Sequence, residues 1–320
     1  MAPAPSAADE PVAEPPGTPA SVGIDEGRLT WIFGSSRSGS TWLLRMLGAL
    51  DGVVPIDDPH LGHHLGVWRP ISLAWATAEH PPDLTTLDRV KHDKDGYFFC
   101  DRYRDAWEPA LRRLIVDRFD AQVADTTSVA EPLVVVKEPG SHVADVLLSM
   151  FPESRLVFLL RDGRDVVDSW LAAYRDGSWA LDEGAFPVTD GGREALVRWQ
   201  SAVWAFRTEV VQRAFEAHPA DRRVMVRYED LVANPSHELA RICAYVPLQA
   251  SADRLEAVAD AHAFDAVPAV AKGETKEIRS ASPGGWRDNL TSAEHDVMHE
   301  VMGPKLAELG YLDPSPVGLA

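Results

Sequence analysis

Residues 29–50 have the sequence LTWIFGSSRSGSTWLLRMLGAL, which is the most informative part of the chain about its fold. Its first part, Leu29–Phe33, is an apolar run of the kind that forms a strand buried on both faces of a parallel sheet. Small residues follow from Gly34 to Thr41, and the apolar segment Trp42–Leu50 predicts a helix. A strand that leads through a small-residue loop into a helix start offers backbone N–H groups to a phosphate. The stretch therefore predicts an α/β fold with an anion-binding loop.

Three more apolar runs have the same character, and each is followed by a polar or glycine-containing turn. They are Leu133–Val136, Leu156–Leu160 and Val224–Val226. Helical patterns follow the first two of these runs, at Val143–Met150 and Val166–Tyr174. The clearest helical periodicity, in steps of three and four, involves Leu196, Trp199, Val203, Phe206 and Val210. Strands that alternate with helices predict a mostly parallel sheet flanked by helices, whose ligands bind beyond the carboxyl ends of the strands.

The 320 residues have room for one large domain. Residues 1–25 are rich in Ala, Pro and Glu, so we expect a disordered tail there, with no signal peptide, and a single domain over residues 26–315. Within that domain, residues 56–130 are rich in Trp, His and Pro and have weak periodicity. This segment is interpreted as a lid or insertion.

Composition argues against several classes of protein. The net charge of −18 disfavours nucleic-acid binding, because phosphate backbones require a basic field, and an anionic nucleotide would need positive charge concentrated locally. No apolar run approaches the roughly 18 residues of a transmembrane helix. The two cysteines, Cys100 and Cys243, lie in no metal or redox spacing, and we expect a cytoplasmic protein. No pattern predicts the oligomeric state.

The loop matches the phosphate-binding pattern G-x-x-x-x-G-K-[ST] except at one position. Ser40 stands where that pattern has lysine, and the basic residue Arg37 lies three positions earlier. A nucleoside-triphosphate enzyme uses the lysine to span the β- and γ-phosphates. A cation in the middle of the loop suits a shorter group, such as a 5′-phosphosulfate. The alternative is an ordinary Gly/Ser turn before a helix.

Residues 36–42, SRSGSTW, resemble the loop [PS]-[KR]-S-G-[ST]-T-W of sulfotransferases that use 3′-phosphoadenosine 5′-phosphosulfate (PAPS), in particular their bacterial-like branch. The resemblance implies a P-loop-type sulfotransferase fold. It also implies that Arg37 contacts the bridging oxygen and stabilises the leaving phosphate. The cradle of the 5′-phosphate would be Ser38, Gly39, Ser40 and Thr41, with Trp42 near the adenine.

A second segment, RDGRDVVDS at residues 161–169, resembles the family's 3′-phosphate motif R-[DN]-x-[RK]-D-x-x-x-S. An arginine that leaves a buried strand at a helix start is well placed to bind a phosphate. The resemblance implies that Arg161 and Ser169 bind the 3′-phosphate. The alternative is a surface turn with Arg–Asp pairs.

Two further matches are shorter. Residues 228–231, YEDL, resemble a strand-end segment of the family and imply Tyr228 near the adenine. Residues 279–287, RSASPGGWR, resemble the loop R-K-G-x-x-G-x-W-[KR] but depart from it at the first triad. We expect Arg279 to contact the 3′-phosphate and Trp286 to hold the loop.

Sulfuryl transfer needs a base for the acceptor proton. Some branches of the family have a histidine two residues after a strand-end lysine, but Lys137 is followed by Glu138 and Pro139. Other branches have a glutamate soon after the first helix, where this chain has Asp58, our first candidate for the base. The other candidates are Asp57, Glu138, His60, His63 and His64. The three histidines have no standard zinc spacing, and we expect no metal.

The sequence thus predicts an enzyme that transfers a sulfuryl group from PAPS to a hydroxyl or amine and releases 3′-phosphoadenosine 5′-phosphate (PAP). The Trp- and His-rich segment 56–130 suggests a small-molecule or lipid-like acceptor. Two other functions stay open at this point. One is a small-molecule kinase that uses ATP and Mg²⁺, and the other is a non-catalytic nucleotide-binding module.

Overall fold

A computed structural model describes residues 23–65, 93, 95–183, 185, 188, 190–276, 278–279 and 282–312. Most of the expected N-terminal tail and residues 66–92 of the expected lid lie outside the described residues. No helix in the described part of the chain is both long enough and apolar enough to cross a membrane.

The described strands form one sheet of five parallel strands in the order β2-β3-β1-β4-β5. They are β1 (Leu29–Phe33), β2 (Val53–Asp57), β3 (Leu133–Lys137), β4 (Arg155–Leu160) and β5 (Arg223–Arg227). The phosphate-loop strand β1 is central, with Ile32 aligned to Lys137 of β3 and to Val157 of β4. The predicted α/β class and the four predicted strands are confirmed.

Strand β2 escaped prediction because its sequence, VVPID, carries Pro55 at its centre. Proline has no backbone N–H to donate to a strand ladder, so it is confined to sheet edges and strand ends. Among the described strands β2 lies at the edge and pairs only with β3, with Pro55 aligned to Val135. Because a strand at the edge of a sheet can contain a proline, Pro55 is compatible with β2 as part of the sheet.

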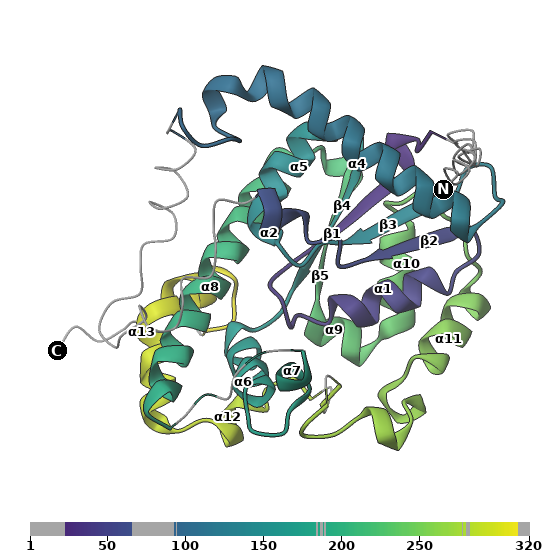
Figure 1. Cartoon of the computed structure of the whole chain (residues 1–320). Helices are drawn as coiled ribbons and strands as arrows, with labels where there is room; N and C mark the ends of the chain where they lie inside the picture. Colours follow the sequence, from purple (N-terminus) through teal and green to yellow (C-terminus); the bar gives the residue numbers. More distant parts are fainter. Residues whose placement is uncertain are drawn as a thin grey trace, which may run out of the picture.

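The strands are apolar on both faces because helices cover both. Alternate residues of β1 divide between the layers: Trp31 and Phe33 belong to one buried cluster and Ile32 to the other. The first cluster is formed with α4, α5, α6, α8 and α13, and the second with α1, α10 and α11. Figure 1 shows α8 and α13 on one side of the sheet and α11 on the other. This is the three-layer arrangement expected of an α/β protein.

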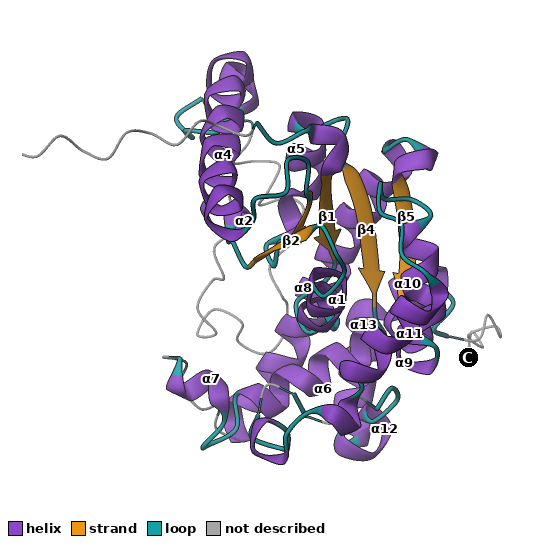
Figure 2. Cartoon of the chain, turned by 90° about the vertical axis from the view of Figure 1, so that its right-hand side faces the viewer, coloured by secondary structure: helices purple, strands orange, loops and turns teal. Residues whose placement is uncertain are grey.

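The α-helices have the following bounds: α1 (Ser40–Gly48), α2 (Leu61–Leu65), α4 (Arg104–Thr126), α5 (Ala144–Met150), α6 (Gly163–Ala173), α7 (Trp179–Asp182), α8 (Asp190–Ala217), α9 (Tyr228–Ala233), α10 (Pro235–Cys243), α11 (Ala252–Ala261), α12 (Trp286–Asn289) and α13 (Ser292–Glu308). Short 3₁₀ helices lie at Glu26–Arg28, Asp101–Tyr103, Ser141–Val143, Ala220–Arg222, Phe264–Ala266 and Ala269–Ala271. In Figure 2 the arrowhead of β4 points toward α6 and α12, so these helices lie near the carboxyl ends of the strands.

The segment expected to be a lid contains two elements of the folded layers. β2 lies in the sheet, and α4 buries Trp107, Ile115, Phe119 and Val123 in the first cluster. The helix is hard to recognise in the sequence because charged residues interrupt its apolar face. The expected role of residues 56–130 in acceptor binding stays a prediction.

Helix α6 is packed unusually closely against α8 and α13. A Cβ atom on Gly163 would lie 2.5 Å from Cδ2 of Trp204 and 2.7 Å from Sδ of Met302. A glycine is therefore required at the first turn of α6, directly after the strand that ends at the candidate site.

We expect Gly163→Ala to lower the free energy of unfolding by about 1–3 kcal/mol, because the added methyl group overpacks the junction of three helices. Gly191→Ala is the matched control, since among the described residues no atom other than the nearby backbone of α8 itself lies within 4 Å of its Cβ position. That variant should be unchanged or more stable by up to about 1 kcal/mol. Urea denaturation of both variants tests this; equal stabilities would contradict the close packing.

Candidate active site

The predicted site residues gather at the carboxyl edge of the sheet. The loop 34–39 follows β1, Lys137 ends β3, Arg161 follows β4, and Tyr228 follows β5. In open parallel sheets this edge is where ligands bind. Helix α1 begins there, so its first backbone N–H groups face the same space.

The loop has a backbone path that needs glycine at two points. A Cβ on Gly34 would lie 2.3 Å from the Leu159 carbonyl oxygen, so the loop leaves β1 in contact with the backbone of β4. Gly39 has a φ of +89°, and a Cβ there would lie 2.6 Å from the ring of Tyr228. Arg37 also has a positive φ, +70°, which is uncommon for a residue with a side chain. The loop is therefore held against both neighbouring segments.

Arg37 contacts two other predicted ligands. Its Nε donates to Oγ of Ser169 at 3.1 Å, and its carbonyl oxygen accepts from Nη1 of Arg161 at 2.7 Å. Its guanidinium also lies over the ring of Trp179, 5.1 Å from the centroid. The segments expected to bind the two ends of the nucleotide thus contact each other directly.

Arg161 and Tyr228 form the next layer of the site. The guanidinium of Arg161 lies over the Tyr228 ring at 4.3 Å, and its buried Nε has no hydrogen-bond partner among the described residues. Trp42 meets the same tyrosine edge-on at 6.4 Å, and its Nε1 donates to the carbonyl of His262 at 2.8 Å. A buried, unsatisfied guanidinium nitrogen beside two aromatic rings suits an anionic aromatic ligand.

A cavity of about 680 Å³ opens beside these residues. Among the described residues, the arginines Arg37, Arg45, Arg161 and Arg279 line it, together with one carboxylate, Asp265. The protein as a whole carries a charge of −18, so the positive charge is concentrated at this site. The segment 261–268 forms the far wall, and no sequence motif had indicated it.

Arg279 reaches the cavity from the loop that precedes α12. Both of its terminal nitrogens donate to the carboxylate of Asp168 on α6, which is 1% exposed and also accepts from Nδ2 of Asn289 at 2.9 Å. The neighbouring Asp165 accepts from the backbone N–H of Gly284 at 2.7 Å. Helix α6 thus fixes the position of this late loop.

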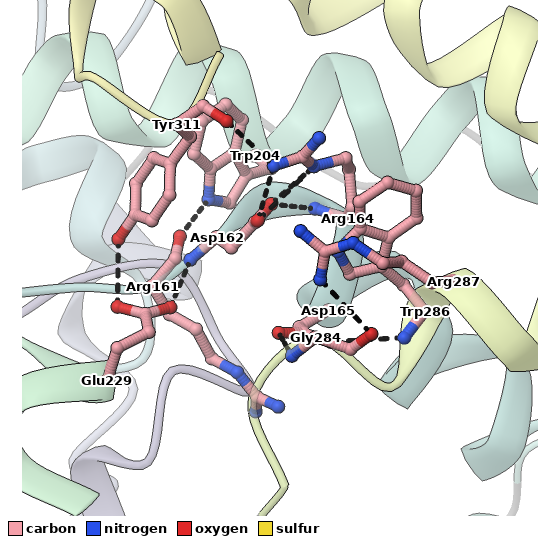
Figure 3. Close-up of polar contacts among 10 residues, drawn as sticks. All are labelled: Arg161, Asp162, Arg164, Asp165, Trp204, Glu229, Gly284, Trp286, Arg287 and Tyr311. Carbon is pink, nitrogen blue, oxygen red and sulfur yellow. Dashed lines mark hydrogen bonds and ion pairs between the residues drawn. The ribbon is translucent and has the colours of Figure 1, made fainter. Parts of the chain in front are cut away.

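A network behind Arg161 holds its backbone in place (Figure 3). Nε1 of Trp204 donates to the Arg161 carbonyl at 3.2 Å, and the next backbone N–H donates to Glu229 at 3.0 Å. Trp286 lies between two guanidinium groups, those of Arg164 at 4.2 Å and Arg287 at 4.7 Å. In Figure 3 the guanidinium of Arg161 points away from this network. These contacts fit the holding role expected for Trp286.

A second cavity, of about 670 Å³, adjoins the first at the loop. Both cavities are lined by Arg37, Ser40, Thr41 and Arg45. The second cavity has aromatic walls from α6, α7 and α8, made by Trp170, Tyr174, Trp179 and Trp199. These tryptophans lie outside the segment from which aromatic lining had been expected.

Lys137, which no sequence motif had assigned to the site, contacts the phosphate loop. Its buried Nζ donates to Oγ1 of Thr41 at 3.1 Å and pairs with Oδ1 of Asp57 and of Asp58, each at 2.7 Å. The sequence signal that could have indicated Lys137 is its place at the end of an apolar run that forms a buried strand. This lysine links the phosphate loop to the two candidate carboxylates.

Glu138 has a different environment from the two aspartates. Its carboxylate is buried and accepts the backbone N–H groups of Leu61 at 2.8 Å, Gly62 at 3.3 Å and Gly140 at 2.6 Å. Burial raises its pKa, while these three hydrogen bonds oppose the shift. The side chain tethers the segment that follows β2.

The predicted histidines His60 and His63 are part of this segment. Nδ1 of His60 and Nδ1 of His63 are 3.2 Å apart, and the ring of His63 meets that of buried His142 at 6.1 Å. The side chain of His64 lies outside the described residues. Within the described part of the chain there is no group of three or more His, Cys, Asp or Glu side chains that could hold a metal ion.

The fold is an α/β fold with a P-loop-type loop between β1 and α1, and two adjoining cavities meet at that loop. The sequence profile described as "Sulfotransferase family" matches residues 30–252 of this chain. The chain therefore belongs to the sulfotransferase family, and it is a sulfuryl-transfer enzyme, as the loop motif predicted.

Solved structures of sulfotransferases are similar to this chain, and one of them has a TM-score above 0.5. Mouse sulfotransferase SULT7A1 in complex with PAP matches with a TM-score of 0.53 and 10% identity, over 89% of this chain and 87% of that one. Sulfotransferase STF9 from Mycobacterium avium has a TM-score of 0.49 and 15% identity, over 88% and 76% of the two chains. A sulfotransferase from Alicyclobacillus acidocaldarius has a TM-score of 0.46 and 13% identity, over 89% and 96%. No curated protein sequence matches this chain.

Stability should fall in mild acid because of His142. Burial, with the charge of Arg207 second, lowers the pKa of this imidazole from 6.5 to about 3. Between these values the unfolded chain binds a proton that the folded protein does not, so stability is lost as the pH falls below 6.5. The loss attributable to this group should reach about 2 kcal/mol by pH 5.

Urea denaturation of the wild type and His142→Gln at pH 8 and pH 5 measures this effect. The difference between the two pH values should be smaller in the variant by about that amount, and other titrating groups cancel from the comparison. Identical pH dependence in both proteins would show that His142 is not held neutral.

Proposed function

We propose that this protein transfers a sulfuryl group from PAPS to a hydroxyl or amine of a small-molecule or lipid-like acceptor and releases PAP. The observation that carries the proposal is the meeting of the two cavities at the loop, where Arg37, Ser40 and Thr41 line both. A donor in the first cavity and an acceptor in the second would have their reacting groups at the same place.

The first cavity supplies the chemistry that a doubly phosphorylated adenosine requires. Backbone N–H groups at the start of α1 suit the 5′-phosphate, and Ser38, Gly39, Ser40 and Thr41 are its proposed cradle. Arg161, Ser169 and Arg279 are proposed to bind the 3′-phosphate. Trp42 and Tyr228 offer aromatic faces and edges to the adenine. The mouse protein with the same fold is a PAP complex.

In the proposed reaction the acceptor oxygen or nitrogen bonds to sulfur, and the bond from sulfur to the bridging oxygen breaks. The electron pair of that bond stays on the 5′-phosphate, which gains negative charge. Arg37 is proposed to stabilise this charge, and Nζ of Lys137, 3.1 Å from Oγ1 of Thr41, adds a second cation beside the loop.

The acceptor proton needs a base in the second cavity. Asp57, Asp58, His60 and Glu138 all line it. Both oxygens of Glu138 already accept backbone N–H groups, which leaves it poorly suited to the task. Asp58 pairs with Lys137, has a φ of +47° and remains our choice for the base.

The walls of the second cavity favour an apolar or aromatic acceptor. Trp170, Tyr174, Trp179 and Trp199 offer flat surfaces to a ring or a hydrocarbon chain.

Incubation of the protein with PAPS and a panel of phenols, alcohols and amines tests the proposal. The expected result is PAP release together with an acceptor heavier by one SO₃ unit. Phosphorylation of the acceptor with ATP and Mg²⁺ would indicate a kinase, and PAP binding without turnover of any acceptor would indicate a non-catalytic module.

Substitution of the two arginines should separate binding from chemistry. PAP at 100 times its dissociation constant should add about 2.7 kcal/mol to the free energy of unfolding, visible as a higher melting temperature. Arg37→Ala should reduce kcat far more than PAP affinity, because its proposed role is on the leaving phosphate. Arg161→Ala is the matched control and should lose affinity and turnover together; equal losses of affinity in both variants would contradict the assignment.

Neutralising the aspartates one at a time tests the base. Asp58→Asn should reduce kcat by about 10²- to 10⁴-fold, the usual contribution of a general base, with little change in PAP affinity. Asp57 also pairs with Lys137, so Asp57→Asn serves as the control. We expect a much smaller loss of kcat in that variant. A larger loss in Asp57→Asn would transfer the role to that residue.

A further inference from the structure

A buried arginine lies beneath the phosphate loop and belongs to none of the sequence motifs. Arg207, on α8, is only 5% exposed and lines the second cavity. Its Nη1 donates to Oγ of Ser36 at 2.7 Å, a contact between positions 171 residues apart. The hydroxyl of Ser36 in turn donates to the carbonyl of Pro139 at 3.5 Å, just beyond the end of β3. Ser36 is therefore held from two elements.

The residue after Ser36 is Arg37, whose φ of +70° is uncommon for a residue with a side chain. Such a conformation persists only where the surroundings enforce it. Arg207 holds the residue before it, and Arg161 donates to the Arg37 carbonyl at 2.7 Å on the other side. The backbone of Arg37 is thus fixed from both directions.

The charge of Arg207 is retained in this buried position. Burial lowers its pKa to about 10, which leaves the guanidinium protonated at neutral pH, and the carboxylate of Glu138 is the nearby opposing charge. Glu138 itself tethers Leu61 and Gly62 through their N–H groups. Arg207 therefore holds the phosphate loop, and Glu138 holds the segment after β2, next to the candidate bases.

We propose that Arg207 is a positioning residue for sulfuryl transfer: through Ser36 it fixes the backbone of Arg37, so that the Arg37 side chain stays where the two cavities meet. This inference rests on the proposed function. Stability alone gives a weak reason for a buried charged side chain, because apolar residues of similar size often serve a fold as well or better.

Four variants test the inference: Ser36→Ala, Arg207→Lys, Arg207→Met and the double variant Ser36→Ala/Arg207→Met. Ser36→Ala and Arg207→Met each remove the hydrogen bond between Arg207 and Ser36. Either variant should lower kcat at least about 30-fold, while the dissociation constant of PAP changes less than about 3-fold. The double variant should be no slower than the slower of its two parents, because both changes break one contact. Arg207→Lys keeps the charge and should recover part of kcat.

Arg198→Met is the matched control. Arg198 lies on the same helix, its side chain is 11% exposed, and it pairs with Glu300 of α13, away from the loop. We expect its kcat to equal that of the wild type. Ser36→Ala removes no charge, so it keeps the test decisive if Arg207→Met fails to fold.

The outcomes separate the two proposals. A wild type that transfers no sulfuryl group from PAPS overturns the proposed function and this inference with it. A wild type that turns over, with kcat unchanged in Ser36→Ala and Arg207→Met, overturns only the inference. Parallel losses of kcat and PAP affinity, or losses that multiply in the double variant, would show a general structural role and would also overturn it.

Discussion

The site depends on one hydrogen bond, the donation from Nη1 of Arg161 to the carbonyl of Arg37 at 2.7 Å. It joins the loop after β1 to the loop after β4, and these strands are neighbours at the centre of the sheet. Because the bond uses a backbone carbonyl, it holds Arg37 without occupying its side chain. The guanidinium of Arg37 can then bond to Ser169 and lie over Trp179, at the border of the two cavities. Two cationic residues thus lie in contact through a neutral group, in a protein whose overall charge is −18.

The fold was predictable wherever the sequence records burial on both faces of a strand. The strands β1, β3, β4 and β5 stand out because each is an apolar run that ends in polar residues at the ligand-binding edge. β2 and α4 did not, for different reasons. Pro55 makes β2 resemble a turn, and only its edge position allows a proline there. Helix α4 meets the core through four spaced apolar residues among many charges, so its periodicity is weak.

The first cavity was the more predictable part of the site because its candidate ligands Arg37, Arg161, Ser169 and Tyr228 lie in three short motifs. These residues lie close together, as the resemblance implied, and their role in donor binding stays a prediction. The second cavity was not predictable, because its lining residues come singly from distant segments. Arg207 contacts the loop across 171 residues, and Trp199 is indistinguishable in the sequence from a core residue of α8. Glu138 illustrates a further limit: the sequence shows a carboxylate near the site, and only the backbone around it shows that its oxygens are engaged.

A crystal structure of the protein with PAP would test directly how the two loops bind the nucleotide. We expect the 5′-phosphate within hydrogen-bond distance of the backbone N–H groups of Ser40 and Thr41. We also expect the 3′-phosphate on the Arg161 guanidinium, with the Arg161–Arg37 hydrogen bond intact. Nucleotide bound elsewhere, or both phosphates remote from Ser40 and Arg161, would contradict the account and leave only the fold and the family.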